Sequence, residues 1–212
     1  CIRDRSRGDD HDQPTNFVAE GYKSLQKGET YVVVPNEVTD VVSSNEDLDA
    51  AISNTEGEAT IALGNNAEIS LKSGAANGKS NDFTFIGDGT SSFDVVSDAV
   101  TAEGGELNYQ RGSTFTFQNL TIKAGEGNFD GIVCDELTYY NCTITGKLAL
   151  YGKATFINCT FENDMANQYS IWTWGGTEVK FEGCTFNTNG KAILLYGNGP
   201  VSYTHLTLPT NS

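Results

Sequence analysis

A six-residue pattern of hydrophobic and polar positions recurs four times in the second half of the chain. Each copy reads aromatic, any residue, Asn or Gly, Cys or Leu, Thr, and then Ile or Phe. The copies lie at residues 117–122, 139–144, 156–161 and 181–186, so they recur after 22, 17 and 25 residues. Spacing of this kind is typical of solenoids, in which each copy forms part of one turn of a stacked coil.

Each copy also predicts a sharp bend in the backbone. In a straight strand Phe156 and Cys159 would face opposite sides, because successive side chains alternate. Asn158, like Gly183 in the last copy, tolerates the left-handed backbone conformation that a short corner needs. After such a corner Cys159 and Phe161 both point inward. The repeat therefore predicts a strand, a corner and a second strand, as in a parallel β-helix.

A second, alternating motif lies in each coil, at residues 132–135, 148–151, 171–174 and 193–196. Strict alternation places its first and third residues inside the coil: Ile132, Cys134, Leu148, Leu150, Ile171, Thr173, Ile193 and Leu195. The second and fourth residues face outward. Tyr151, Trp174 and Tyr196 then share one repeat position on adjacent coils, with Trp172 beside them.

These outward rings form what we call the aromatic strip: Tyr151, Trp172, Trp174 and Tyr196. Both tryptophans of the chain lie in it. A contiguous exposed apolar patch indicates an interaction surface, and aromatic faces stack on sugar rings and also suit protein contacts. Two other interpretations stay open. In one, the loop at residues 162–169 folds over the strip and buries it. In the other, the rings only stabilise the sheet by stacking across strands.

The region before the coils predicts a cap for the solenoid. Ser43 and Glu46 form a capping box, and the helix that follows has one apolar face. That face consists of Leu48, Ala51 and Ile52. A helix at residues 43–53 would cover the apolar core and the unpaired edge of the first coil. Strands are expected at residues 59–63, 67–71 and 83–87, and one more at residues 31–35 outside the repeat.

Three cysteines, Cys142, Cys159 and Cys184, occupy the same repeat position, so their thiols should stack inside the solenoid. We interpret them, together with Cys134, as small core residues, because free cysteine is among the most buried residue types. A disulfide and a metal site are the alternatives. The spacing matches no zinc motif, and the chain has no histidine between residues 12 and 204.

Charge and length limit the class of function. The chain has 212 residues, a net charge of −15 and an isoelectric point near 4.3, which disfavours nucleic acid as a partner. Its apolar runs are too short to cross a bilayer as helices. We therefore expect contact with a membrane only through a lipid anchor.

Both ends differ in character from the repeat. Residues 201–210 match the translation of a transposase library adapter, so we predict that residues 200–212 are not native and that further coils are missing. A genuine final strand is the alternative. Residues 1–16 begin with Cys1 and are charged and aperiodic, like the tether of a mature bacterial lipoprotein whose N-terminal cysteine carries lipid. A reading frame truncated at its start is the alternative.

The repeats and the cap together resemble the pectin-lyase-like β-helix proteins, especially the gut-bacterial surface proteins with Asn-Cys-Thr-Phe coils, as at residues 158–161. The resemblance implies an all-β fold, a single-stranded right-handed parallel β-helix with a short N-terminal capping helix. It covers the predicted solenoid at residues 43–199, which follows a strand region at residues 17–42. It also implies export to the extracellular face of a bacterial cell. Since this family includes lyases, hydrolases, adhesins and scaffolds, the fold alone does not specify the activity.

The catalytic patterns of that family are not evident in this sequence. Its lyases hold calcium with several carboxylates, but the acidic residues here do not recur at one repeat position, and Asp130 with Asp135 is the best pair. The hydrolase motifs Asn-Thr-Asp, Gly-His-Gly and Arg-Ile-Lys do not occur. We predict no catalytic residues, metal or cofactor, and a non-catalytic adhesin-like module that binds polysaccharide or another surface protein. The alternative is a truncated polysaccharide lyase or glycoside hydrolase whose catalytic coils are missing.

Overall fold

The structure, a computed structural model, describes residues 18–27, 29–76, 78–98, 105, 107–175, 177–197 and 199–208. The chain divides into two compact units, the first ending at Val38 and the second beginning at Thr39. The predicted tether with Cys1 lies outside the described residues, so its lipidation stays a prediction.

The first unit contains an antiparallel hairpin of β1 (Tyr22–Lys27) and β2 (Thr30–Pro35). The strand predicted at residues 31–35 is β2. Its partner β1 was not predicted, because Leu25 is the only aliphatic residue among the polar and charged side chains of that segment. A single isolated two-stranded hairpin is marginally stable at best in water.

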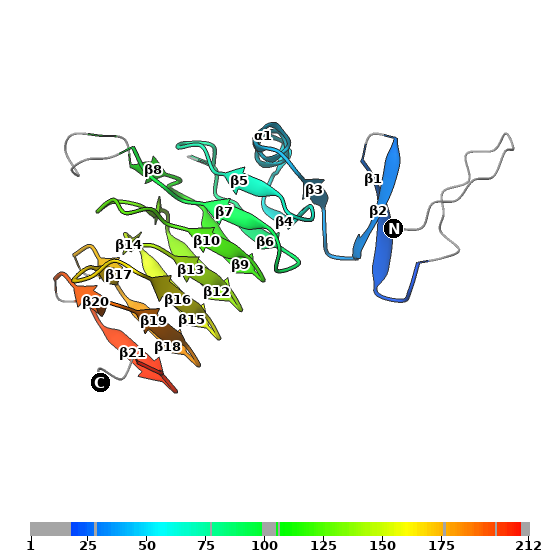
Figure 1. Cartoon of the computed structure of the whole chain (residues 1–212). Helices are drawn as coiled ribbons and strands as arrows, with labels where there is room; N and C mark the ends of the chain where they lie inside the picture. The colour runs from blue at the N-terminus through cyan, green and yellow to red at the C-terminus, as the bar shows by residue number, and fades with distance from the viewer. Residues whose placement is uncertain are drawn as a thin grey trace, which may run out of the picture. The chain divides into compact units, whose positions relative to one another are not determined.

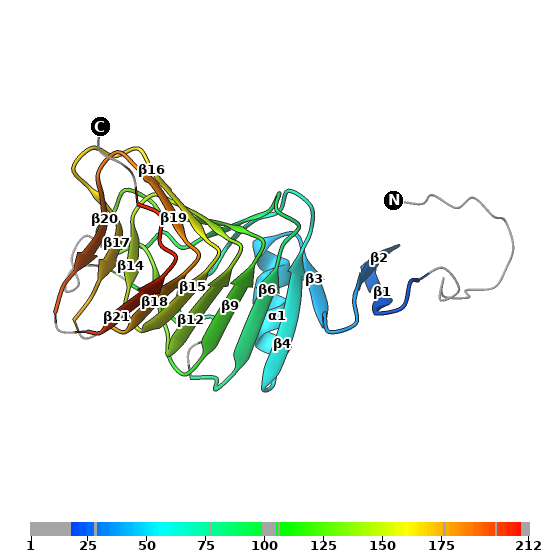
Figure 2. The same ribbon diagram turned by 90° about the horizontal axis from the view of Figure 1, so that it is seen from below.

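The second unit is a parallel β-solenoid of about seven turns, which confirms the predicted parallel β-helix (Figures 1 and 2). Its largest sheet contains β3 (Asp40–Val42), β4 (Glu58–Leu63), β6 (Asp82–Ile86), β9 (Thr114–Gln118), β12 (Glu136–Tyr140), β15 (Lys153–Ile157), β18 (Val179–Glu182) and β21 (Val201–Thr204). The second sheet contains β5 (Glu68–Ser70), β7 (Ser92–Asp94), β10 (Thr121–Lys123), β13 (Thr143–Thr145), β16 (Thr160–Asn163) and β19 (Thr185–Thr188).

A third side of the coil is formed by two shorter sheets. One contains β14 (Leu148–Leu150), β17 (Tyr169–Thr173) and β20 (Lys191–Leu195), and the other contains β8 (Asn108–Tyr109) and β11 (Ile132–Val133). The pairings within the solenoid's sheets are parallel, as stacked rungs require. The solenoid begins at β3, before the predicted start at residue 43. This strand was missed in the sequence because three residues are too few to show alternation.

The predicted corners between the first two sheets are confirmed. Asn119, Asn141 and Asn158 have φ values of +55°, +50° and +53°, and Gly183 has +63°. Asn is among the few residues with a side chain that adopt this left-handed region readily. Each corner lets the chain turn while the residues on both of its sides point into the core.

Aromatic rings form a continuous column inside the coil. Phe117, Tyr139, Phe156 and Phe181 lie at equivalent positions of β9, β12, β15 and β18. Their ring centroids are 5.3, 4.7 and 5.2 Å apart, with interplanar angles of 15° or less. Such stacked pairs contribute beyond the area that they bury, and all four rings are fully buried.

The predicted thiol ladder is also confirmed. Cys142, Cys159 and Cys184 are buried and free, and they follow one another on successive rungs. The hydrogen bond with Cys142 is the main cause that raises the pKa of Cys159 to about 12, and burial raises the pKa of Cys134 to about 12. Cys134 and Cys159 therefore stay protonated at neutral pH and behave as core residues rather than as nucleophiles. The hydrogen bond with Cys159 is the main cause that lowers the pKa of Cys142.

Helix α1 (Asn45–Asn54) covers the first rung. Its apolar face is the predicted one: Leu48, Ala51 and Ile52 are buried and join the same core as the first strands. The capping box lies one residue later than predicted. The Ser44 hydroxyl accepts from the amide of Asp47 (3.2 Å), and the Asp47 carboxylate accepts from the amide of Ser43 (3.1 Å).

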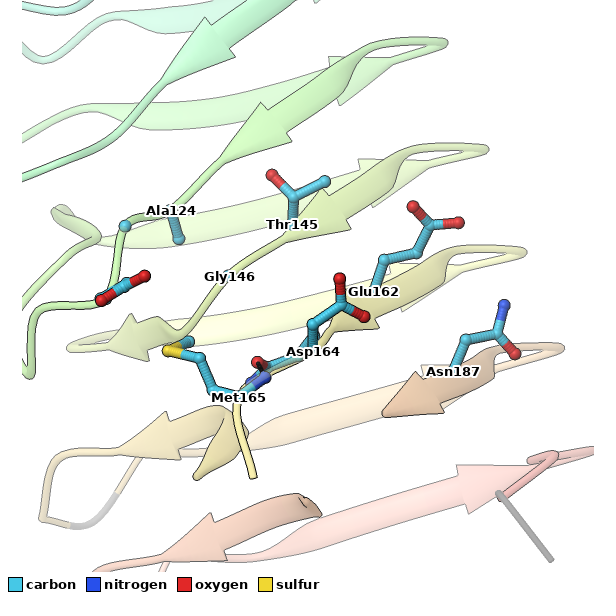
Figure 3. A pocket seen from close by; sticks show the side chains of 10 residues that line it. Ala124, Thr145, Gly146, Glu162, Asp164, Met165 and Asn187 are labelled. Atoms are coloured by element: carbon cyan, nitrogen blue, oxygen red, sulfur yellow. Dashed lines mark hydrogen bonds between the residues drawn. The ribbon is translucent and has the colours of Figure 1, made fainter. Parts of the chain in front are cut away.

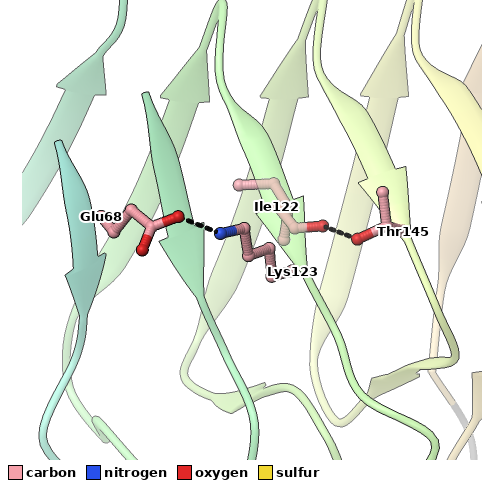
Figure 4. A network of polar contacts seen from close by, with 4 residues as sticks. All are labelled: Glu68, Ile122, Lys123 and Thr145. Carbon is pink, nitrogen blue, oxygen red and sulfur yellow. Dashed lines mark hydrogen bonds and ion pairs between the residues drawn. The ribbon is translucent and has the colours of Figure 1, made fainter. Parts of the chain in front are cut away.

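The outer surface of the second sheet carries polar cross-rung contacts. The Lys123 ammonium lies 2.7 Å from the Glu68 carboxylate, two rungs away, and the Thr145 hydroxyl donates to the carbonyl of Ile122 (Figure 4). The hydrogen bond and charge of Lys123 lower the pKa of Glu68. Both charged groups are exposed, so the pair adds little stability.

The last rung differs from the prediction in two ways. Leu195 was expected inside, but it is 50% exposed, because β20 is the edge strand of its sheet. β21 pairs with β18 in the register of the repeat, and His205 takes the corner conformation with φ +53°. Residues 203–208 thus fit a fifth copy of the pattern, beyond the four copies found in the sequence. Their adapter origin is a matter of nucleotide sequence and stays a prediction.

Candidate functional site

The aromatic strip lies on the outer face of the sheet β14–β17–β20. Ala149 pairs with Trp172 and Trp172 with Leu194, so the following outward residues, Tyr151, Trp174 and Tyr196, are also level with one another. The amide of Trp174 donates to the carbonyl of Leu150 (2.9 Å), which continues the ladder past the end of β14. The alignment predicted from the repeat is therefore present.

The rings of the strip contact one another. Trp174 and Tyr196 are offset-stacked, with centroids 5.8 Å apart at 26°, and Trp172 meets Trp174 edge to face at 5.4 Å. Trp172, Trp174 and Tyr196 thus form one connected cluster across the rungs, and part of each of these ring surfaces is used within it. Cross-strand stacking of this kind stabilises the sheet, as one of the interpretations requires.

Exposure divides the strip into two halves. Trp174 is 39% exposed and Tyr196 is 58% exposed, whereas Trp172 and Tyr151 are half-buried. Large aromatic side chains at such exposure leave apolar surface in water, which indicates a surface available to a partner. We call Trp174 and Tyr196 the open half of the strip.

The other half is covered by Phe129. Its ring lies 5.5 Å from the Trp172 ring and 6.3 Å from the Trp174 ring, and Phe129 itself is 7% exposed. Phe129 belongs to a loop at residues 125–131, which we call the strap. The sequence singled out a different loop, residues 162–169, as the cover. The only feature of the sequence that indicates the strap is Phe129, a single aromatic residue in a polar, Gly-rich turn.

The strap is fastened at both ends to β14. The amide of Lys147 donates to the carbonyl of Gly125 (3.0 Å), and the amide of Ala149 donates to the carbonyl of Asp130 (2.7 Å). Between these points the strap is held by side chains. The Lys147 ammonium donates to the Asn128 amide oxygen (2.6 Å), and the Tyr151 hydroxyl donates to the carbonyl of Phe129 (2.9 Å). Burial is the main cause that raises the pKa of Tyr151, so this hydroxyl remains a donor.

Two polar atoms on this outer face are buried and have no hydrogen-bond partner: Trp172 Nε1 and Ser170 Oγ. Ser170 lies two residues before Trp172 in β17, so both side chains point outward. An unpaired buried donor costs roughly 1 to 3 kcal/mol, and such groups call for an explanation. Neither atom was singled out from the sequence.

The loop predicted as the alternative cover lines a separate groove. Glu162, Asp164 and Met165 form a cavity of about 510 Å³ with Thr145 and Asn187 (Figure 3). Thr145, Glu162 and Asn187 occupy equivalent outward positions of β13, β16 and β19. This groove follows the second sheet, whereas the strip lies on the third.

The two carboxylates considered as a metal pair, Asp130 and Asp135, both accept hydrogen bonds from backbone amides. Both carboxylate oxygens of Asp130 accept from backbone amides, those of Ser97 (2.9 Å) and Gly127 (3.0 Å). The Asp135 carboxylate accepts from the amide of Gly112 (3.3 Å). Over the part of the chain that the structure describes, no group of three or more His, Cys, Asp or Glu side chains could hold a metal ion.

Comparisons of the chain with protein-family models, with curated proteins and with solved structures found no match. Among the described residues, no helix is long and apolar enough to cross a membrane.

Proposed function

We propose that this chain is a non-catalytic module that binds glycan through the open half of the aromatic strip. A parallel β-solenoid is compatible with carbohydrate-binding or lyase-like β-helix proteins. The observation that carries the proposal is the exposure of Trp174 and Tyr196, stacked on adjacent rungs of one outer wall. Exposed rings of this kind suit the apolar faces of sugar rings, and the tyrosine hydroxyl and indole N–H suit their hydroxyl groups.

The glycan is expected to be neutral. At a net charge of −15 the chain repels acidic polymers over a distance set by the salt concentration. The proposal includes the finer assignment to the pectin-lyase-like proteins, export to the extracellular face of a bacterial cell, and a lipid anchor at Cys1. The family assignment and export rest on the resemblance of the repeats and the cap, and the lipid anchor rests on the character of residues 1–16.

A glycan array tests the proposal with three proteins: the unchanged chain, Trp174→Ala and Tyr140→Ala. Tyr140 is a matched control, since it is 38% exposed but lies on β12, away from the strip. We expect the unchanged chain and Tyr140→Ala to bind the same neutral glycans. Trp174→Ala should bind them at least about tenfold more weakly, corresponding to about 1.4 kcal/mol.

Equal binding by Trp174→Ala and the unchanged chain would remove the strip from the proposal. If the unchanged chain and Phe129→Ser, which is introduced below, both bind no glycan, glycan binding is refuted. The strip would then be a contact for another surface protein, the other partner class that suits exposed aromatic residues.

A further inference from the structure

In the covered half of the strip, the Phe129 ring lies where a ligand ring could lie against Trp172. The Phe129 ring contacts both tryptophan rings, which places an aromatic group where a partner of the strip would lie. Two donor atoms on the same outer face, Trp172 Nε1 and Ser170 Oγ, have no hydrogen-bond partner. A phenylalanine side chain provides apolar contact but accepts no conventional hydrogen bond, so the Phe129 ring offers the Trp172 N–H no acceptor.

A third donor lies on the same outer face. Since Leu148 pairs with Ile171, the preceding residues Lys147 and Ser170 are level on neighbouring strands. The Lys147 ammonium is held by two neutral amide oxygens, those of Asn128 (2.6 Å) and Gln168 (3.3 Å). This outer face therefore combines an indole ring with hydroxyl, indole and ammonium donors.

We propose that Phe129 fills a second ring position of the strip, and that a saccharide ring takes this position when the strap moves aside. This inference rests on the proposed function and extends it from the open half to the covered half. Hydroxyl oxygens of the saccharide would accept from Trp172 Nε1 and Ser170 Oγ. The ring itself would pack on the Trp172 indole in place of the Phe129 ring.

The way the strap is fastened allows this movement. Its backbone is bonded to β14 only near its ends, at Gly125 and Asp130, and residues 126–128 between them are exposed. The middle is held through the Lys147 and Tyr151 side chains, which can exchange their strap acceptors for oxygens of a ligand. The ends can thus stay in place while Phe129 leaves the tryptophans.

The variant Phe129→Ser tests the inference on the same glycan array. Removal of the ring uncovers Trp172, and we expect binding of the neutral glycans to strengthen about tenfold. Adding Trp172→Phe, which keeps an aromatic ring but removes the N–H donor, should cancel most of that gain. Ser170→Ala should reduce it as well. Thermal unfolding of each variant confirms that it is folded before binding is compared.

A second readout needs no glycan. The two tryptophans of the chain both lie in the strip, so Trp174→Phe leaves Trp172 as the only tryptophan. In that background we expect Phe129→Ser to raise the acrylamide quenching of Trp172 fluorescence severalfold. Unchanged quenching would mean that Phe129 does not cover Trp172, which overturns the inference whatever the array shows.

The array separates the two proposals. If Trp174→Ala loses binding but Phe129→Ser binds like the unchanged chain, the proposed function stands and the second ring position is refuted. If only Phe129→Ser binds glycan, the second position is supported and the open half alone is not the site. A gain that survives Trp172→Phe would refute the role of the indole donor. If neither the unchanged chain nor Phe129→Ser binds any glycan, both proposals are refuted.

Discussion

Replacing Phe156 by Ala is expected to lower the free energy of unfolding by roughly 3 to 5 kcal/mol, the range for loss of a buried Phe ring. Phe156 is fully buried, and its ring stacks on Tyr139 below and Phe181 above, at 4.7 and 5.2 Å. It also meets Phe161 edge to face at 5.1 Å. The cavity would interrupt the column in both directions, and neighbouring rungs on parallel strands have little freedom to close it.

Urea unfolding followed by circular dichroism measures this loss. Tyr140→Ala is the control, because it removes a similar ring from the outside of the adjacent strand β12, where substitutions usually change stability by less than about 0.5 kcal/mol. Equal stability of the two variants would contradict a core built on the aromatic column.

Replacing Gly146 by Ala is expected to have the second large effect. Its φ is +81°, which a side chain disfavours, and an added Cβ would overlap the backbone carbonyl oxygen of Ala124 on the neighbouring rung. We expect a total loss of roughly 2 to 6 kcal/mol, from about 1 to 3 kcal/mol of backbone strain and a similar amount of overpacking.

Gly57→Ala separates these two causes. Gly57 has nearly the same φ, +89°, but no atom lies within 4 Å of the position of an added Cβ. The same unfolding experiment should therefore show only the backbone strain for Gly57→Ala, about 1 to 3 kcal/mol. If Gly146→Ala were no more destabilising than Gly57→Ala, the close contact between Gly146 and the Ala124 carbonyl would be contradicted.

The rungs could be predicted from the sequence because each of their features is local and repeated. Phe156 and Cys159 cannot both point into the core from a straight strand, so the corner follows from six residues, and four copies fix the register. The strip followed in the same way, since the positions of Trp174 and Tyr196 depend only on counting from one coil to the next.

The strap could not be predicted, because its contacts join segments without a shared pattern. Phe129 lies in a loop that has no counterpart in the other copies, and its contact with Trp172 spans more than one coil. Likewise, the unpaired state of Ser170 Oγ depends on what covers it, which alternation alone does not specify. Leu195 was misplaced for a related reason, since burial needs a further strand stacked on β20.

Cross-linking of engineered cysteines tests most directly whether the strip is a row on stacked rungs. In a Cys1→Ser background, Tyr151→Cys with Trp174→Cys, or Trp174→Cys with Tyr196→Cys, places two cysteines on adjacent rungs. Their Cα atoms would lie about 4.8 Å apart, within the range of a disulfide. Tyr151→Cys with Tyr196→Cys places them two rungs apart, at about 9 to 10 Å, beyond that reach. The account predicts that mild oxidation closes the two adjacent pairs and not the third. Closure of the third pair at the same rate, or of neither adjacent pair, would contradict the stacked strip.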